Sequence, residues 1–333
     1  MATELPRTVD WDGAAIVAID QVALPHETRS LRITGVDELI DAIVRLAIRG
    51  APALGGAGAL GVALLARQHP DDPAVVRGQA ERLATARPTA VNLRWGVQRA
   101  LARLGDGPDA VLAEALAVLA EDERVNRQAS ERAAEEIRSL CTRRPLRILT
   151  HCNAGRLATV AWGTALGAVR CLAEAGDIEY VLADETRPLL QGARLTAYEL
   201  AELGIPYRIC PDSAAAAAMS LGMVDCVVVG ADRIARSGDV ANKIGTFPVA
   251  LAAAHHRIPF IVVAPESTVD TSISSGADIH IEQRDPAEVT HIAGVRIAPA
   301  GADAFNPAFD VTPADLVTAI VTQDRVWRPG RSA

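Results

Sequence analysis

A histidine, a cysteine and an asparagine follow a short apolar run in the segment RILTHCNAG, residues 147–155. The run is typical of a strand and an alanine-rich helical pattern comes after the turn, so the segment predicts a strand that delivers Cys152 to a helix N-terminus. Free amides and the positive end of a helix dipole favour a thiolate at such a place. We therefore expect Cys152 to be a reactive residue.

The other four cysteines give no sign of chemistry. Cys141, Cys171, Cys210 and Cys226 form no CxxC pair, and five cysteines cannot all be paired within one chain. Three of them, Cys171, Cys210 and Cys226, lie in helical or strand-like runs, where a cysteine usually behaves as a small buried apolar residue. The sequence predicts reduced thiols.

A carboxyl group is placed in a comparable way near the middle of the second half. Asp232 follows the apolar run VDCVVVGA, which is typical of a buried strand. Partial loss of solvent raises the pKa of a carboxyl group and suits it to general acid chemistry. Asp232 is therefore the candidate partner of Cys152.

The elements that must position these residues alternate in type. Strand-like runs at 146–150, 178–183, 206–210, 224–229 and 259–264 alternate with helical stretches, which predicts a doubly wound α/β fold with a mostly parallel sheet. Ligands bind beyond the carboxyl ends of such strands. The polar residues that follow the five runs are His151, Cys152, Asn153, Asp184, Glu185, Arg187, Asp212, Ser213, Asp232, Arg233, Glu266 and Ser267.

Several other segments offer groups that suit a bound anion. Asn242 and Lys243 lie in GDVANKIGT, interpreted as a loop, and Gln191 and Arg194 lie in RPLLQGARL. Arg49, Gly50 and Ala51 form a helix-breaking turn with a guanidinium and free amides. Arg87, with Pro88 beside it, precedes a helical pattern that runs to Leu104, although a lone arginine there is more often a surface charge.

The glycines Gly56, Gly58 and Gly61 spell the GxGxxG pattern of dinucleotide-binding proteins. A helix and a turn precede them instead of a strand, and no acidic residue follows at the required spacing. Nicotinamide or flavin binding is therefore not expected. The simpler interpretation is that small residues let two helices approach closely.

The chain of 333 residues is longer than one core usually organises. Short alternating segments in residues 1–33 predict a small antiparallel β element, and helical patterns dominate from residue 36 to residue 140. The break at Thr142–Pro145 suggests a boundary. We expect a β plus helical domain at 1–143 and a Rossmann-like domain at 144–333.

Composition narrows the class of function. A formal charge of −8 argues against a general nucleic-acid surface, and the sequence has neither a targeting pattern nor a membrane-length apolar run, so we expect a cytoplasmic protein with no nucleic-acid or membrane partner. His255 and His256 point to different helix faces and lack further ligands. We expect no metal site.

Six segments, in order, resemble one family: RGAPALG, RPTAVNL, LTHCNAG, DETRPLLQGARLTAYEL, GADRIARSGDVANKIGT and NPAFDVTP. From about Ile48 to Pro313 the chain resembles the methylthioribose-1-phosphate isomerases of methionine salvage. That family shares its fold with the alpha, beta and delta subunits of eukaryotic initiation factor 2B. Six ordered motifs are far more specific than one.

The resemblance implies an aldose–ketose isomerisation of a sugar 1-phosphate by a homodimer that needs no cofactor. It implies Cys152 and Asp232 as the catalytic pair. It implies substrate contacts at Arg49, Gly50, Ala51, Arg87, Gln191, Asn242 and Lys243, and so reverses the interpretation of Arg87 as a surface charge.

Two other functions stay open at this point. A related isomerase acting on 5-deoxyribose 1-phosphate or ribose 1,5-bisphosphate would need a different pocket at C5. A non-catalytic subunit like those of initiation factor 2B would have no chemical need for Cys152 together with Asp232.

Overall fold

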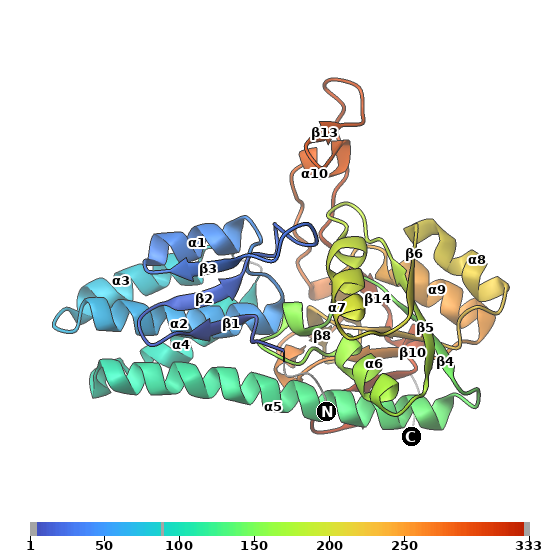
Figure 1. The fold of residues 1–333 in the computed structure, drawn as a ribbon, viewed down its shortest axis with the longest axis horizontal. Coiled ribbons are helices and arrows are strands. Elements are labelled where there is room, and N and C mark those ends of the chain that lie inside the picture. Colours follow the sequence, from blue (N-terminus) through green and yellow to red (C-terminus); the bar gives the residue numbers. More distant parts are fainter. Residues whose placement is uncertain (1–4, 88–89, 330–333) are drawn as a thin grey trace. The chain divides into compact units, whose positions relative to one another are not determined.

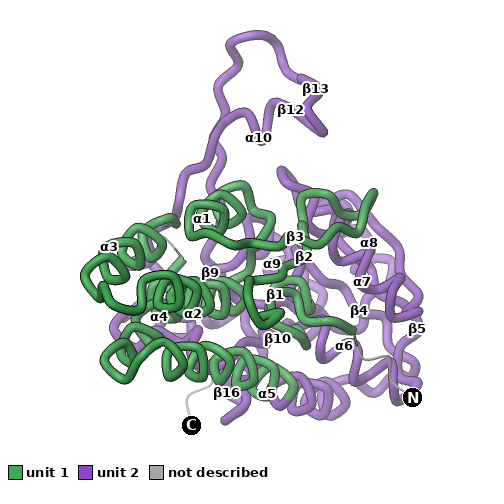
Figure 2. The backbone as a smooth tube through the Cα atoms, turned by 60° about the vertical axis from the view of Figure 1, so that its left-hand side comes forward, with its two compact units in different colours: residues 1–127, 155–163 green, residues 128–154, 164–333 purple. Residues whose placement is uncertain are grey.

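The structure, a computed structural model, describes residues 5–87 and 90–329. Contacts divide the chain into two compact units: residues 1–127 and 155–163 form unit 1, and residues 128–154 and 164–333 form unit 2 (Figure 2). Helix α5 (Pro108–Leu140) contributes its first part to unit 1 and its last part to unit 2. The domain division at 143/144 stays a prediction.

Unit 1 contains the antiparallel β element expected in residues 1–33. Strands β1 (Val9–Trp11), β2 (Ile16–Ile19) and β3 (Ser30–Ile33) pair in this order, each antiparallel to the next. The helices of the unit besides α5 are α1 (Val36–Val44), α2 (Ala51–Gln68), α3 (Pro73–Ala84) and α4 (Val91–Leu101), with short 3₁₀ turns at Leu104–Asp106 and Arg156–Ala158.

Helix α2 is the centre of unit 1, buried from Ala53 to Ala66 and packed against the sheet and its neighbouring helices (Figure 1). Its glycines mark close approaches. A methyl group at Gly58 would lie 2.7 Å from the Leu93 carbonyl oxygen of α4, and one at Gly96 of α4 would collide with the backbone of Gly55. The GxGxxG pattern is therefore a helix-packing surface, as the simpler interpretation held.

Unit 2 is built on a seven-stranded sheet in the order β16-β15-β10-β7-β4-β5-β6. All neighbours are parallel except the edge pair β15–β16. Numbered along the chain, the six parallel strands lie in the order 3-2-1-4-5-6, which is the order of doubly wound sheets. The strands are β4 (Leu146–Thr150), β5 (Ile178–Asp184), β6 (Tyr207–Cys210), β7 (Cys226–Val229), β10 (Phe260–Val263), β15 (Ala319–Val321) and β16 (Val326–Trp327).

Helices cover both faces of this sheet. Alternate strand residues such as Ile148 and Val228 join a core with α5 and α6 (Ala165–Glu174), while Leu149 and Val227 join a core with α8 (Ala215–Ser220) and α9 (Thr246–His256). Burial on both sides explains why β7 and β10 are apolar at every position. The mixed α/β class and the five expected strands are confirmed.

A smaller sheet extends unit 2, in the order β11-β8-β9-β14. Its strands are β8 (Arg233–Ala235), β9 (Val240–Lys243), β11 (Val269–Asp270) and β14 (Phe309–Thr312). The interpretation of GDVANKIGT as a loop is therefore wrong, because Asn242 and Lys243 lie in β9 and pair with β14.

The remaining elements of unit 2 are short. Figure 1 shows α10 (Ala287–Thr290) and the hairpin of β12 (His291–Ile292) and β13 (Val295–Arg296) on an arm that extends from the rest of the unit. Helix α7 (Ala197–Glu202) follows a π-helical turn, η3 (Gly192–Thr196), and 3₁₀ turns lie at Asp212–Ala214, Glu266–Thr268, Gly276–Asp278 and Ala314–Leu316. Within the described ranges, no helix combines the length and the apolar character needed to cross a membrane.

Candidate active site

Cys152 and Asp232 follow two adjacent strands at the point where the strand order of the sheet reverses. Cys152 comes two residues after β4 and Asp232 three residues after β7, and β4 pairs with β7. The chain leaves β4 toward β5 on one side and leaves β7 toward β10 on the other. Ligands bind at such a reversal in doubly wound sheets, because the connections diverge and leave a crevice.

The backbone at Cys152 differs from the expectation of a helix N-terminus. Helix α6 begins only at Ala165, so the interpretation of Cys152 as a thiol at the start of this helix is wrong. Cys152 is half-buried and has a φ of 64°, in the left-handed region that non-glycine residues seldom adopt. The sequence pattern carried no signal for this conformation.

Two threonine hydroxyls bind the peptide groups of Cys152. Its N–H donates to Oγ1 of Thr186 over 2.9 Å, and its carbonyl oxygen accepts from Oγ1 of Thr196 over 2.6 Å. Both threonines are completely buried. A left-handed residue costs about 1–2 kcal/mol and a hydrogen bond contributes about 0.5–1.5 kcal/mol, so the two bonds together offset the strain.

The segment that carries these threonines is itself unusual. Thr186 and Leu190 also have positive φ values, 65° and 56°, and the π-helical turn η3 begins directly after Gln191. Gly192 is required at this position because a methyl group there would collide with the carbonyl oxygen of Asp184. Strained backbone and π-turns concentrate at functional sites.

His151 ties three elements of the site together. Its Nδ1 lies 2.9 Å from Oδ2 of Asp184 at the end of β5, and its Nε2 lies 2.8 Å from the carbonyl oxygen of Ile244, just after β9. A carbonyl oxygen only accepts, so Nε2 carries a proton. One further proton is then shared between Nδ1 and Asp184.

The electrostatics around this pair follow from burial. Burial lowers the pKa of His151, but the hydrogen bond and charge of Asp184 outweigh it, so the net pKa is raised. Burial raises the pKa of Asp184 against the opposing effect of His151. Cys210 donates to Oδ1 of Asp184 over 3.4 Å, and burial together with this carboxylate raises the pKa of the Cys210 thiol to about 12.

Carboxylates order the neighbouring turns. Asp212 accepts from the backbone N–H groups of Thr186 and Arg187, each over 2.7 Å. Asp310 accepts from the N–H of Gly245 over 2.7 Å and that of Phe247 over 3.1 Å, at the start of α9. These two carboxylates give hydrogen-bond partners to backbone N–H groups in turns and at a helix start, as capping side chains do.

Asp232 is half-buried, and its N–H donates to the carbonyl oxygen of Ala241 over 2.9 Å. This bond links the residue that follows β7 to β9. The expectation that Asp232 has a raised pKa stays a prediction.

Asn242 and Lys243 lie on β9, and Asn242 is almost completely buried. Nδ2 of Asn242 donates to Oγ1 of Thr246 over 3.0 Å. Nζ of Lys243 donates to the carbonyl oxygen of Ala308 over 2.9 Å and lies 4.9 Å from the centre of the Phe309 ring. A strand therefore holds both side chains in defined positions.

Gln191 has a polar atom without a partner. The side chain is 7% exposed, and its Oε1 has no hydrogen-bond partner among the residues that the structure describes. A buried acceptor of this kind is costly unless a donor reaches it. A bound molecule that donates a hydrogen bond would satisfy it.

Arg49, Gly50 and Ala51 lie in unit 1 at the start of α2. Nε of Arg49 donates to Oε1 of Gln21 over 3.1 Å. Gly50 has a φ of 95°, and a methyl group there would collide with the backbone of Ala158. The turn expected at these residues ends at Gly50, because Ala51 is already the first residue of α2 and the preceding helix, α1, ends at Val44.

Arg87 is half-buried in the turn between α3 and α4. Helix α4 begins at Val91, and Pro88 lies outside the described residues. The structure thus places five predicted site residues in unit 2 (Cys152, Asp232, Gln191, Asn242 and Lys243) and four in unit 1 (Arg49, Gly50, Ala51 and Arg87).

His151, Asp184 and Asp212 have ligand-type atoms within 4.8 Å of one another. The set does not suit a metal ion well. Both imidazole nitrogens of His151 already have partners, and Asp212 accepts two backbone N–H groups. A metal would have to break these bonds.

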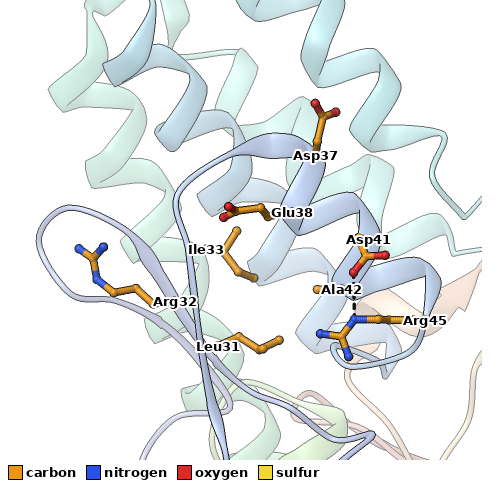
Figure 3. Close-up of a pocket in the computed structure, with 8 residues that line it drawn as sticks. All are labelled: Leu31, Arg32, Ile33, Asp37, Glu38, Asp41, Ala42 and Arg45. Atoms are coloured by element: carbon orange, nitrogen blue, oxygen red, sulfur yellow. Dashed lines mark hydrogen bonds and ion pairs between the residues drawn. The ribbon is translucent and has the colours of Figure 1, made fainter.

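One described cavity, of about 450 Å³, lies between β3 and α1 of unit 1 (Figure 3). Asp37, Glu38 and Asp41 share its wall with Arg32 and Arg45, and Arg45 donates to Asp41 over 3.0 Å. None of the predicted site residues lines it.

The protein is thus an α/β protein in which a half-buried thiol and a carboxyl follow adjacent strands where the strand order of a doubly wound sheet reverses, the place at which such proteins bind ligands in general. The chain belongs to the Initiation factor 2 subunit family, whose model matches residues 47–329.

Relatives with high sequence identity cover nearly the whole chain. A methylthioribose-1-phosphate isomerase of Anaeromyxobacter sp. (strain K) is 53% identical over 98% of this chain and 95% of its own. A probable bifunctional methylthioribose-1-phosphate isomerase/methylthioribulose-1-phosphate dehydratase of Nocardia farcinica (strain IFM 10152) is 61% identical over 96% of this chain. The chain spans 58% of the length of that bifunctional relative.

Two solved structures have the same fold. The 5-methylthioribose 1-phosphate isomerase of Pyrococcus horikoshii OT3 is 40% identical, with a TM-score of 0.89 and coverage of 98% of this chain and 94% of its own. A structure described as translation initiation factor eIF-2B, subunit delta, from A. fulgidus is 43% identical, with a TM-score of 0.87 and coverage of 98% and 97%.

Proposed function

We propose that the protein is an isomerase that converts 5-methylthioribose 1-phosphate to 5-methylthioribulose 1-phosphate, since its relatives are named methylthioribose-1-phosphate isomerases. The observation that carries the proposal is the placement of Cys152 and Asp232 after adjacent strands at the reversal of the sheet. An intramolecular aldose–ketose isomerisation of such a sugar needs a proton donor and, on the proton-transfer route, a group that carries hydrogen from C2 to C1. It needs no other reactant.

The reaction must open a ring that its 1-phosphate locks. Asp232 donates a proton to the ring oxygen as the bond from that oxygen to C1 breaks. Hydrogen leaves C2 and arrives at C1, either as a proton through Cys152 or as a hydride directly. C2 becomes the ketone as the proton of its hydroxyl group passes to the Asp232 carboxylate, which restores the acid. The product has the same atoms as the substrate on either route.

The other predicted residues bind the substrate in this proposal. Arg49, the amides at Gly50 and Ala51, and Arg87 hold the phosphate, as guanidinium groups and helix N-termini do in general. Gln191, Asn242 and Lys243 hold the sugar. The unpartnered Oε1 of Gln191 supports this role.

The same proposal covers the domain organisation, the cellular location, the oligomeric state, the cofactors and the pathway. We infer a Rossmann-like catalytic domain at 144–333 on an N-terminal domain at 1–143, a cytoplasmic homodimer, no cofactor or metal, and a place in methionine salvage. The strand order 3-2-1-4-5-6 and the similarity to isomerases support it.

The test is to incubate the purified protein with 5-methylthioribose 1-phosphate and to follow ketose formation. Wild type should turn over, whereas Cys152→Ser and Asp232→Asn should lose at least about a hundredfold in kcat. Ribose 1,5-bisphosphate and 5-deoxyribose 1-phosphate serve as comparison substrates. Faster turnover of either sugar would make it the preferred substrate in place of 5-methylthioribose 1-phosphate. Full activity of both variants would show that Cys152 and Asp232 are not the catalytic pair.

A further inference from the structure

The conformation of Cys152 depends on two side chains that belong to one segment. Thr186 and Thr196 lie at either end of the stretch that carries Gln191, and their hydroxyls bind the N–H and the carbonyl oxygen of Cys152 over 2.9 and 2.6 Å. Cys152 is thus held from both sides of its own α-carbon.

Neither hydroxyl is free to rotate. Oγ1 of Thr186 also donates to the carbonyl oxygen of Asp184 over 3.1 Å, and Oγ1 of Thr196 accepts from Nδ2 of Asn153 over 3.3 Å. Each hydroxyl therefore has one donor and one acceptor partner, which fixes the direction of its hydrogen. The position of Cys152 follows from that of the threonines.

We propose that Thr186 and Thr196 are positioning residues that hold the thiol of Cys152 in its reactive orientation and couple it to the Gln191 segment. The inference rests on the proposed function, because it assumes that Cys152 acts on the substrate. The φ of 64° sets the direction of the Cα–Cβ bond, and a relaxed backbone would turn Sγ away. Misplacement of a reacting group by about 1 Å can cost a hundredfold in rate.

The experiment compares Thr196→Val, which removes the hydroxyl at nearly constant shape, with Thr196→Ser, which keeps it. Thr312→Val is the matched control, because Thr312 is equally buried and its Oγ1 has no partner in the described part of the chain. Thr186→Val and Thr186→Ser form a second pair in case one valine variant fails to fold. Cooperative thermal unfolding establishes that each variant is folded.

Two readouts separate positioning from a general structural effect. The first is steady-state kinetics with 5-methylthioribose 1-phosphate, where Thr196→Val should lower kcat at least about tenfold with KM within about twofold. The second is the pH profile of iodoacetamide alkylation at Cys152, followed by mass spectrometry, which should shift in the valine variants. Thr196→Ser and Thr312→Val should stay within about threefold of wild type in both.

The outcomes of this test and of the proposed function are distinct. If wild type does not turn over the substrate, the proposed function fails, and the alkylation profiles alone then test whether Thr186 and Thr196 position Cys152. Folded Thr186→Val and Thr196→Val variants with wild-type alkylation profiles, and with wild-type kcat where the enzyme is active, would overturn the inference. An equal loss in Thr312→Val would overturn it as well.

Discussion

Nδ1 of His151 lies 2.9 Å from Oδ2 of Asp184, and neither side chain has any exposed area. The pair joins the ends of β4 and β5 directly beside Cys152, and Nε2 of the same imidazole reaches the carbonyl oxygen that follows β9. One buried side chain thereby links the ends of β4 and β5 to the end of β9, the strand that carries Asn242 and Lys243. Its removal leaves a carboxyl group without its partner in a dry environment.

His151→Gln should lower the free energy of unfolding by about 3–5 kcal/mol, because breaking a buried pair strands one charge. Urea unfolding at pH 7 measures it. The control is His280→Gln, since His280 is exposed, and it should change stability by less than about 0.5 kcal/mol. Equal effects of the two substitutions would contradict the assigned role of the pair.

The pair also predicts a pH dependence. The pKa values of His151 and Asp184 are both raised in the folded state, so the folded protein binds more protons than the unfolded chain. The stability that His151 contributes is fully present below its unfolded pKa of about 6.5 and is lost as pH rises through the folded value. Compared with the neutral double variant His151→Gln/Asp184→Asn, wild type should lose stability as the pH rises from about 6.5 through neutral and alkaline values. A constant difference over this range would refute the prediction.

Cys210 should be an unreactive thiol although it is only half-buried. Its pKa of about 12 leaves about one thiolate in 10⁴ at pH 8, against about a quarter for an ordinary cysteine with a pKa of about 8.5. Iodoacetamide should therefore label Cys210 about a thousandfold more slowly in the folded protein than in the unfolded chain. The variant Asp184→Asn distinguishes the effect of the Asp184 charge from that of limited access of the reagent to the thiol. If labelling of Cys210 is no faster in this variant, burial alone protects the thiol.

Much of the fold was predictable because its signals are local. The apolar runs of β7 and β10 are long enough to identify buried strands, and the polar residues after them gave the edge of the sheet. The strands β15 and β16 were missed, since runs of three and two residues give no periodicity to detect. Strand β9 was taken for a loop because Gly238, Asn242 and Gly245 are turn residues, whereas its pairing with β14 depends on residues almost 70 positions away.

Candidate site residues could be selected from the sequence by their type and position, but the contacts that hold them in place could not be predicted. Cys152 could be selected from its place after a strand, yet its left-handed backbone depends on Thr186 and Thr196, which are distant in the sequence. A threonine in a turn carries no signal of its long-range partner. His151 appeared only as one polar residue among several after the strands.

Gly96→Ala should destabilise unit 1, because the added methyl group would collide with the backbone of Gly55 where α4 crosses α2. We expect a loss of about 1–3 kcal/mol, typical of overpacking. Gly78→Ala is the matched control: Gly78 lies in the interior of α3 with nothing within 4 Å of the added carbon, so this change should stabilise by about 0.5–1 kcal/mol. Thermal unfolding of both variants measures the two changes in stability. If both variants are stabilised or both are destabilised, the close packing of α2 and α4 is contradicted.

Gly50→Ala should lose both stability and substrate affinity. Gly50 has a φ of 95°, and its added methyl group would collide with the backbone of Ala158, which cannot move aside as a flexible side chain can. Gly107 offers a matched control, because its φ is 96° and nothing lies within 4 Å of an added carbon. Gly107→Ala therefore reports the conformational strain alone, about 1–3 kcal/mol.

The collision should cost Gly50→Ala about 1–3 kcal/mol beyond that strain, measured by urea unfolding. Because the proposed phosphate contact uses the amides at the start of α2, KM for 5-methylthioribose 1-phosphate should rise at least about tenfold in this variant and stay within about twofold of wild type in Gly107→Ala. A folded Gly50→Ala variant with an unchanged KM would mean that this turn does not bind the phosphate and that Gly50 has a purely structural role.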